Sequence, residues 1–158
     1  MIDKNALDKL SKKLKEKKLR LATAESATGG LIAHILTNIS GSSDYFDRGI
    51  ISYSNKAKIE LLDVSREDLA KYGAVSEIIA RQMADGARKK SGVDIAVSTT
   101  GIAGPTGGSK EKPVGTVFIC FSSKTKTLVK RFKFIGDRLE IKEQFCKAAL
   151  EMILENIS

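Results

Sequence analysis

Three short segments of the sequence carry side chains whose types and spacing could do chemistry. The first is Glu25-Ser-Ala-Thr-Gly-Gly30, in which Ser26 follows a buried stretch and precedes two glycines and a helical pattern. Backbone N–H groups at such a turn suit an anion or the oxyanion of a tetrahedral intermediate. Taken alone, the segment is better explained by a helix cap from Ser26 or Thr28, with the glycines making the turn.

The second segment, Tyr53-Ser-Asn-Lys-Ala-Lys58, supplies a candidate base. The positive end of a helix dipole and burial both favour the neutral form of a lysine. A neutral lysine can take the proton of a serine hydroxyl, a form of nucleophilic catalysis that needs no histidine. Lys58 adjoins the apolar stretch 59–62, so we expect it inside and Lys56 at the surface. Tyr53 can face the same cleft if strand gives way to helix after it, whereas a solvated lysine is the ordinary alternative.

The third segment, residues 99–108, is a glycine-rich loop after a predicted strand, which suggests phosphate binding or close backbone approach. Ser109 stands where a P-loop needs its second glycine, and G-x-G-x-x-G is absent. The loop therefore supports neither a Walker ATPase nor a dinucleotide site, and an ordinary flexible loop is the alternative. Arg138 could bind a phosphate or carboxylate, or it could pair structurally with Asp137 or Glu140.

The other reactive residue types narrow the chemistry. His34 is the only histidine, and its place in a helical pattern predicts a helix-packing role, so we expect a mechanism without histidine. Cys120 and Cys146 stand in apolar surroundings without C-x-x-C or zinc-type spacing. We expect both to be small core residues without a disulfide, and we expect neither a metal nor a cofactor.

The elements that must position these residues alternate between strand and helix. The patterns predict strands over 19–24, 48–53 and 93–99, a hairpin of 114–122 with 127–134, and helices over 3–18, 31–37, 55–62, from Ser65, over 76–90 and over 137–157. Such an order implies an α/β sheet with helices on both faces and an antiparallel element from the hairpin. Ligands bind beyond the carboxyl ends of strands in such sheets, and all three segments lie there.

Length and composition fit one soluble domain over residues 1–158, with 42% hydrophobic and 29% charged residues. No apolar run approaches the roughly 18 residues of a membrane span, and the charged start of the chain predicts no secretory signal, so we expect a cytoplasmic protein. The formal net charge is +8, and residues 1–20 hold eight basic and three acidic side chains. We interpret this region as a solvated helix face rather than a nucleic-acid patch, because basic stretches often give false positives. A second basic group, 124–133, falls on the predicted hairpin, and neither group has the repeated interleaving of aromatic residues expected of a single-strand binder.

Together the motifs resemble the CinA C-terminal domain family over about residues 21–150. The resemblance rests on Ala24-Glu-Ser-Ala-Thr-Gly-Gly30, Gly41-Ser-Ser43, Tyr53-Ser-Asn-Lys-Ala-Lys58, Leu61-Leu-Asp-Val64, Gly73-Ala-Val-Ser-Glu77, Thr100-Gly-Ile-Ala-Gly-Pro-Thr-Gly-Gly108, Pro113-Val-Gly-Thr-Val117 and Gly136-Asp-Arg138. Each motif is moderately specific, and all of them in this order are highly specific.

The resemblance implies a three-layer α/β/α sandwich with a mostly parallel mixed sheet, commonly assembled as a homodimer. It also implies hydrolysis of the carboxamide of nicotinamide mononucleotide, a small-molecule nucleotide, to nicotinic acid mononucleotide and ammonia without a metal. By the same resemblance Ser26 is the nucleophile, Lys58 its general base and Arg138 the phosphate contact. Tyr53 assists proton transfer or positions the ring.

Further substrate-binding residues carried over from the resemblance are Glu25, Thr28, Gly29, Gly30, Thr100, Gly101 and Gly104. Gly29 and Gly30 are expected beside the oxyanion. The chain departs from the family at Ala27, where cysteine is common, and at Lys142, where arginine is frequent. Many relatives also carry an N-terminal molybdopterin-binding-like domain. Two other hypotheses stay open: a catalytically weak nucleotide-binding or sensor module, and a nucleic-acid-associated competence or damage protein.

Overall fold

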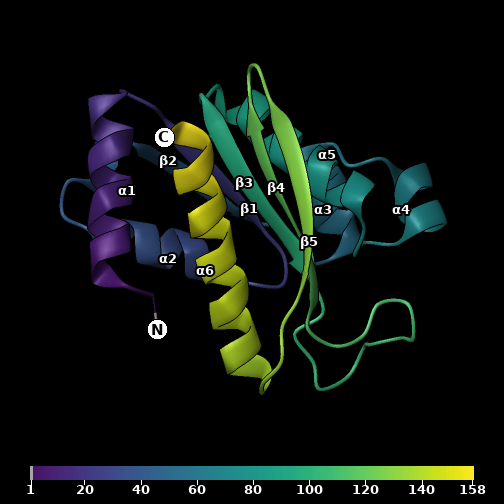
Figure 1. The fold of residues 1–158 in the computed structure, drawn as a ribbon. Helices are drawn as coiled ribbons and strands as arrows, with labels where there is room; N and C mark the ends of the chain where they lie inside the picture. The colour runs from purple at the N-terminus through teal and green to yellow at the C-terminus, as the bar shows by residue number, and fades with distance from the viewer. Residues whose placement is uncertain (1) are drawn as a thin grey trace.

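The strands of the computed structural model, which describes residues 2–158, form one mixed sheet in the order β2-β1-β3-β4-β5 (Figure 1). β1 pairs in parallel with both β2 and β3, and β4 pairs antiparallel with both β3 and β5. The bounds are β1 (Leu21–Glu25), β2 (Phe46–Ile51), β3 (Ile95–Gly101), β4 (Thr116–Ser123) and β5 (Thr127–Lys133). The predicted mixed sheet with an antiparallel hairpin is confirmed.

Helices cover both faces of this sheet, which confirms the three-layer prediction (Figure 1). One face packs against α1 (Lys4–Glu16), α2 (Leu31–Thr37) and α6 (Arg138–Ile157). On the other face α5 (Glu77–Ser91) lies against the strands, and α3 (Asn55–Leu62) and α4 (Arg66–Tyr72) pack against α5. A short 3-10 helix, η1 (Ser42–Asp44), precedes β2. Within residues 2–158, no helix has the length and apolar character needed to cross a membrane.

Polar caps set the helix starts near the site. The Ser54 side chain accepts a hydrogen bond from the Ala57 N–H and so begins α3. Asp137 forms a capping box with Glu140 at the start of α6. β2 was predicted over 48–53 but lies over 46–51. The Ser52 N–H still donates to the Glu25 carbonyl of β1, and the chain then turns at Tyr53 to reach the Ser54 cap of α3.

The cysteine prediction is confirmed, whereas the histidine prediction is wrong. Cys120 and Cys146 are free and fully buried, and burial raises the pKa of the Cys120 thiol to about 12. His34 is exposed on α2, where its ring lies against the Asn38 side chain. Ile32 and Leu36 form the buried face of this short helix, and His34 lies off that face.

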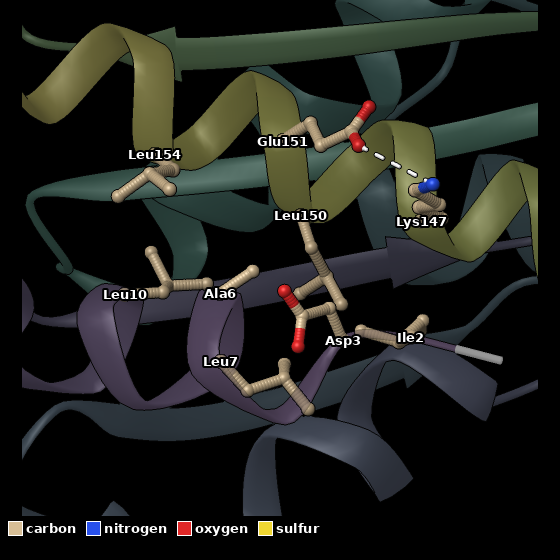
Figure 2. A pocket seen from close by; sticks show the side chains of 9 residues that line it. All are labelled: Ile2, Asp3, Ala6, Leu7, Leu10, Lys147, Leu150, Glu151 and Leu154. Carbon is tan, nitrogen blue, oxygen red and sulfur yellow. Dashed lines mark ion pairs between the residues drawn. The ribbon is translucent and has the colours of Figure 1, made fainter.

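α1 packs against α6 at the outside of the molecule, and a cleft of about 180 Å³ lies between them (Figure 2). Its walls are mostly aliphatic, and the ion pair of Lys147 with Glu151 lies at its edge. Leu10 and Leu14 of α1 are buried against the core, while lysines such as Lys12 point to solvent. This arrangement agrees with the prediction of a solvated basic face on α1.

Candidate active site

The three predicted segments meet at the carboxyl ends of β1, β2 and β3, where the structure has a pocket of about 320 Å³. Seven of the predicted site residues line it: Ser26, Tyr53, Lys58, Thr100, Gly101, Gly104 and Arg138. The sequence-based expectation that these segments share one edge of the sheet is therefore supported by the topology. The other four predicted residues, Glu25, Thr28, Gly29 and Gly30, are not among those that line it.

Lys58 and Ser26 form the chemical centre of the pocket. The Lys58 Nζ lies 3.0 Å from the Ser26 Oγ, and it also donates to the backbone carbonyls of Ser52 at 2.9 Å and Tyr53 at 3.0 Å. Lys58 is only 1% exposed, as expected, whereas Lys56 is exposed and lies near Glu60. Burial disfavours the ammonium and lowers the Lys58 pKa to about 8.

The hydrogen bonds of Lys58 suit both of its protonation states. An ammonium has three N–H donors, which match the two carbonyls and the Ser26 hydroxyl. A neutral amine has two N–H donors and one lone pair. If the two carbonyls of Ser52 and Tyr53 keep the donors, the lone pair faces the serine hydroxyl, which is the arrangement of a base beside a nucleophile.

Glu25 supports the turn that carries Ser26 rather than lining the pocket. Its fully buried carboxylate accepts hydrogen bonds from the backbone N–H groups of Gly30, Ile32 and Ala33, at 3.2, 2.9 and 3.0 Å. The hydroxyls of Thr23 and Thr28 donate to it as well. The carboxylate thereby satisfies N–H groups that the first turn of α2 leaves unpaired. Glu25 was predicted to bind substrate, and its oxygens are instead used inside the protein.

Thr28, Gly29 and Gly30 belong to the same turn. The Thr28 hydroxyl lies 2.8 Å from the Thr99 hydroxyl, the Gly29 N–H donates to the Ser26 carbonyl, and the Gly30 N–H donates to Glu25. Gly29 and Gly30 were expected beside the oxyanion, but both N–H groups already have acceptors. Both glycines have positive φ, +59° and +101°, which explains why glycine occupies these positions.

The backbone N–H of Ala27 is differently placed. Ala27 follows Ser26 directly and lines the pocket. Among the hydrogen bonds of residues 2–158, none uses this N–H. A backbone donor on the residue after a nucleophilic serine is a common part of oxyanion sites. Sequence reasoning missed it, because almost all residue types carry an N–H group, and its position on the pocket wall is set by the fold.

Arg138 joins two of the segments across the rim of the pocket. It donates to the Gly104 carbonyl at 2.6 Å and lies 3.3 Å from the Tyr53 hydroxyl. In the capping box the Asp137 carboxylate accepts from the Glu140 N–H, and the Glu140 carboxylate accepts from the Asp137 N–H. Among the described residues, neither carboxylate forms an ion pair with Arg138. Three of the five guanidinium N–H groups remain for a ligand if each contact uses one.

The far wall of the pocket comes from residues that sequence reasoning did not assign to the site. Ala74 and Val75 line it, and the Thr100 hydroxyl donates to the Ala74 carbonyl at 2.8 Å. The Gly73–Glu77 motif was a usable signal for this wall. In the part of the chain that the structure describes, no cluster of three or more His, Cys, Asp and Glu side chains could hold a metal ion.

Comparison with known proteins gives consistent matches. Residues 3–157 match the CinA C-terminal domain. A CinA-like protein of Chloroherpeton thalassium is 53% identical over 146 residues, which cover 90% of this chain and 35% of that protein. One of Syntrophomonas wolfei is 49% identical over 138 residues, 87% of this chain and 33% of that protein. The chain thus spans about a third of the length of these relatives.

Solved structures agree over nearly the whole chain. The competence/damage inducible protein CihA of Agrobacterium tumefaciens is 40% identical with a TM-score of 0.91, covering 98% of this chain and 97% of that one. A competence-damaged protein superfamily member from Klebsiella pneumoniae is 32% identical with a TM-score of 0.93, covering 97% and 96%. Fold, motifs and identity lead to one conclusion: the chain belongs to the CinA C-terminal domain family.

Proposed function

We propose that this protein is an amidohydrolase that converts nicotinamide mononucleotide to nicotinic acid mononucleotide and ammonia, with Ser26 as nucleophile and Lys58 as general base. The observation that carries the proposal is the 3.0 Å contact between the Lys58 Nζ and the Ser26 Oγ, with the lysine buried. A buried lysine with a pKa near 8 holds a usable fraction of neutral amine at neutral pH. The substrate identity rests on the family resemblance.

In the first half-reaction the neutral Lys58 amine takes the Ser26 proton, and the Oγ attacks the carboxamide carbon. The carbonyl oxygen becomes an oxyanion, for which the free N–H of Ala27 is the nearest backbone donor in sequence to the nucleophile. When the intermediate collapses, the carbon–nitrogen bond breaks and the Lys58 ammonium gives its proton to the leaving nitrogen. Ammonia departs, and an acyl ester on Ser26 remains.

In the second half-reaction a water molecule replaces ammonia. Lys58, neutral again, takes a proton from this water, and the resulting hydroxide attacks the acyl carbon. The second tetrahedral intermediate breaks the ester bond, and Ser26 recovers its proton from Lys58. The product is the carboxylic acid, and the enzyme returns to its starting state. No step requires histidine, which agrees with the position of His34 outside the pocket.

Tyr53 and Arg138 fit a role in substrate binding at the pocket rim. The Tyr53 hydroxyl contacts Arg138 rather than Lys58 or Ser26, and its side chain is 62% exposed, so we assign it to positioning the ring and not to proton transfer. Arg138 suits a phosphate, because a planar guanidinium can donate two parallel hydrogen bonds to its oxygens. These two residues would fix the distance between the phosphate and the reacting carboxamide.

The test is ammonia release from nicotinamide mononucleotide by the purified protein, with Ser26→Ala and a chelator as controls. We expect release that the chelator does not change and that Ser26→Ala reduces to background while the fold, followed by circular dichroism, is kept. Binding without any release by the wild-type protein would contradict the amidase and favour the nucleotide-binding module. Release that survives in Ser26→Ala would remove Ser26 as the nucleophile.

A further inference from the structure

We propose that Asn55 recognises the ribose diol of the nucleotide substrate and so selects ribonucleotides over their deoxy analogues; this inference rests on the function proposed above. Asn55 lines the pocket together with Ser26 and Lys58. It was not among the residues expected at the site, and it takes no part in the reaction steps described above. Its role is therefore assigned to a part of the substrate that does not react.

The side-chain amide of Asn55 is free to bind a ligand. Other polar side chains of the pocket are already used within the protein, since Thr100 donates to the Ala74 carbonyl and Arg138 donates to the Gly104 carbonyl. Among residues 2–158, the Asn55 side chain has no hydrogen-bond partner. Its donors and its acceptor therefore face the pocket without competition from the protein.

Thr106 is the other polar side chain of the pocket wall that has no hydrogen bond in the described part of the chain. It offers one hydroxyl and lies on the glycine-rich loop, whereas Asn55 is the first residue of the eight-residue helix α3. The Asn55 amide offers an acceptor oxygen and an NH₂ group with two donors. Each hydroxyl of a vicinal diol can donate and accept. One amide can therefore accept from the first hydroxyl and donate to the second.

Asn55 lies between the groups assigned to the two ends of the substrate. It precedes Lys58 by three residues on α3, a spacing that places both side chains on one side of the helix. Ser26 and Lys58 are buried at the bottom of the pocket, whereas Asn55 is exposed, as is Tyr53, whose hydroxyl contacts Arg138 at the rim. Ribose joins the ring that bears the carboxamide to the phosphate. A substrate held at both ends would therefore place its ribose near Asn55.

The lack of charge on Asn55 agrees with this role. An acidic side chain often accepts from the ribose 2′-hydroxyl in sites that bind dinucleotides. Asparagine offers the same kind of acceptor without a negative charge that would repel a phosphate bound at Arg138. Asn55 also borders the hollow between α3 and α4, which places it at the mouth of the pocket rather than at the reacting carboxamide.

The experiment compares wild type with Asn55→Ala on two substrates, nicotinamide mononucleotide and its 2′,3′-dideoxy analogue. We expect wild type to show a KM about tenfold higher for the analogue, a loss typical of two neutral hydrogen bonds. Asn55→Ala should raise KM for the mononucleotide about tenfold, with kcat within about twofold, and should leave KM for the analogue unchanged. The matched control is Asn5→Ala, because Asn5 is also exposed near the start of a helix but does not line the pocket. It should change neither KM value.

An unchanged KM for the mononucleotide in Asn55→Ala would overturn the proposal. An equal rise for both substrates would overturn it as well, because the lost contact would then not involve the diol. A wild-type protein that does not distinguish the two substrates would have the same consequence.

Calorimetric titration of both nucleotides into Ser26→Ala, with and without Asn55→Ala, separates this inference from the amidase. An affinity for the mononucleotide that falls about tenfold in the double variant, with no change for the analogue, supports the role of Asn55 even if wild type releases no ammonia. Equal affinities in the two proteins contradict it even if the amidase is active. No binding of either nucleotide to either protein contradicts both proposals.

Discussion

The Lys58 Nζ lies 3.0 Å from the Ser26 Oγ although 32 residues separate them in the chain. The contact exists because β1 and β2 are parallel neighbours, so the turn after β1 and the start of α3 after β2 meet at one edge of the sheet. The amine is then held by the Ser52 and Tyr53 carbonyls, which belong to the short link between β2 and α3. Sheet topology and one helix cap together produce the nucleophile–base pair.

Replacing Lys58 by arginine should abolish turnover. A guanidinium stays protonated at all accessible pH values and cannot take the serine proton. We expect kcat to fall by at least about a thousandfold, within the range that general base catalysis contributes. Lys56→Arg is the matched control, because this lysine lies two residues away and is exposed. Near-normal turnover in Lys58→Arg would remove Lys58 as the base.

The pH dependence of kcat/KM should follow the ionisation of Lys58. The neutral amine is the active form, and burial lowers its pKa to about 8, so activity should rise with pH and level off above about pH 8. Below the pKa the rate should change about tenfold per pH unit. Initial rates between pH 6 and 10 at low substrate concentration measure this profile. A flat profile over that range would contradict the assignment.

Stability should also depend on Lys58 and pH. The unfolded lysine keeps its proton to about pH 10.5, whereas the folded one loses it near pH 8, so the unfolded state binds more protons between these values. The free energy of unfolding of wild type should therefore rise relative to Lys58→Met by about 2–3 kcal/mol from pH 7 to pH 10. Below pH 8 the difference should be constant.

Urea denaturation of both proteins at pH 7 and pH 10 measures this difference, and the other lysines cancel in the comparison. If the difference between the two proteins is the same at both pH values, Lys58 titrates with an ordinary pKa in the folded protein. In that case the proposed base would be almost fully protonated at neutral pH.

Glu25→Gln should destabilise the fold. The glutamine amide offers one acceptor oxygen where Glu25 uses two, and its NH₂ group would face N–H donors such as that of Ala33. We expect a loss of about 3 kcal/mol, because hydrogen bonds to a buried charged group are broken without replacement. Urea denaturation checks this value. Glu16→Gln, on exposed α1, is the control and should change stability by less than about 0.5 kcal/mol.

Much of this arrangement could be predicted from the sequence because local signals carry it. The apolar stretch after Lys58 and the predicted helix over 55–62 indicated a buried lysine near the start of a helix, as found. The alternation of strand and helix indicated that the segments at Ser26 and Thr100 would share an edge of the sheet. These features depend on residue type and spacing, which the sequence states directly.

Other parts depend on which hydrogen bonds are already used, and no sequence pattern states that. Glu25 was expected at the substrate, yet its oxygens are taken by the turn that it supports. Gly29 and Gly30 were expected at the oxyanion, yet their N–H groups have acceptors, while that of Ala27 has none in residues 2–158. His34 was expected to pack against another helix, but it is exposed, because the buried face of the short helix α2 is formed by Ile32 and Leu36.

The most direct test of the account is to trap the acyl ester on Ser26 before water hydrolyses it. Hydroxylamine added to the assay with nicotinamide mononucleotide attacks an ester at Ser26 and gives a hydroxamate, which mass spectrometry detects beside the acid. The account predicts that the hydroxamate share rises with hydroxylamine concentration in wild type and that Ser26→Ala forms neither product. Ammonia release by wild type with no hydroxamate at any hydroxylamine concentration would contradict the account, because water would then attack the amide directly.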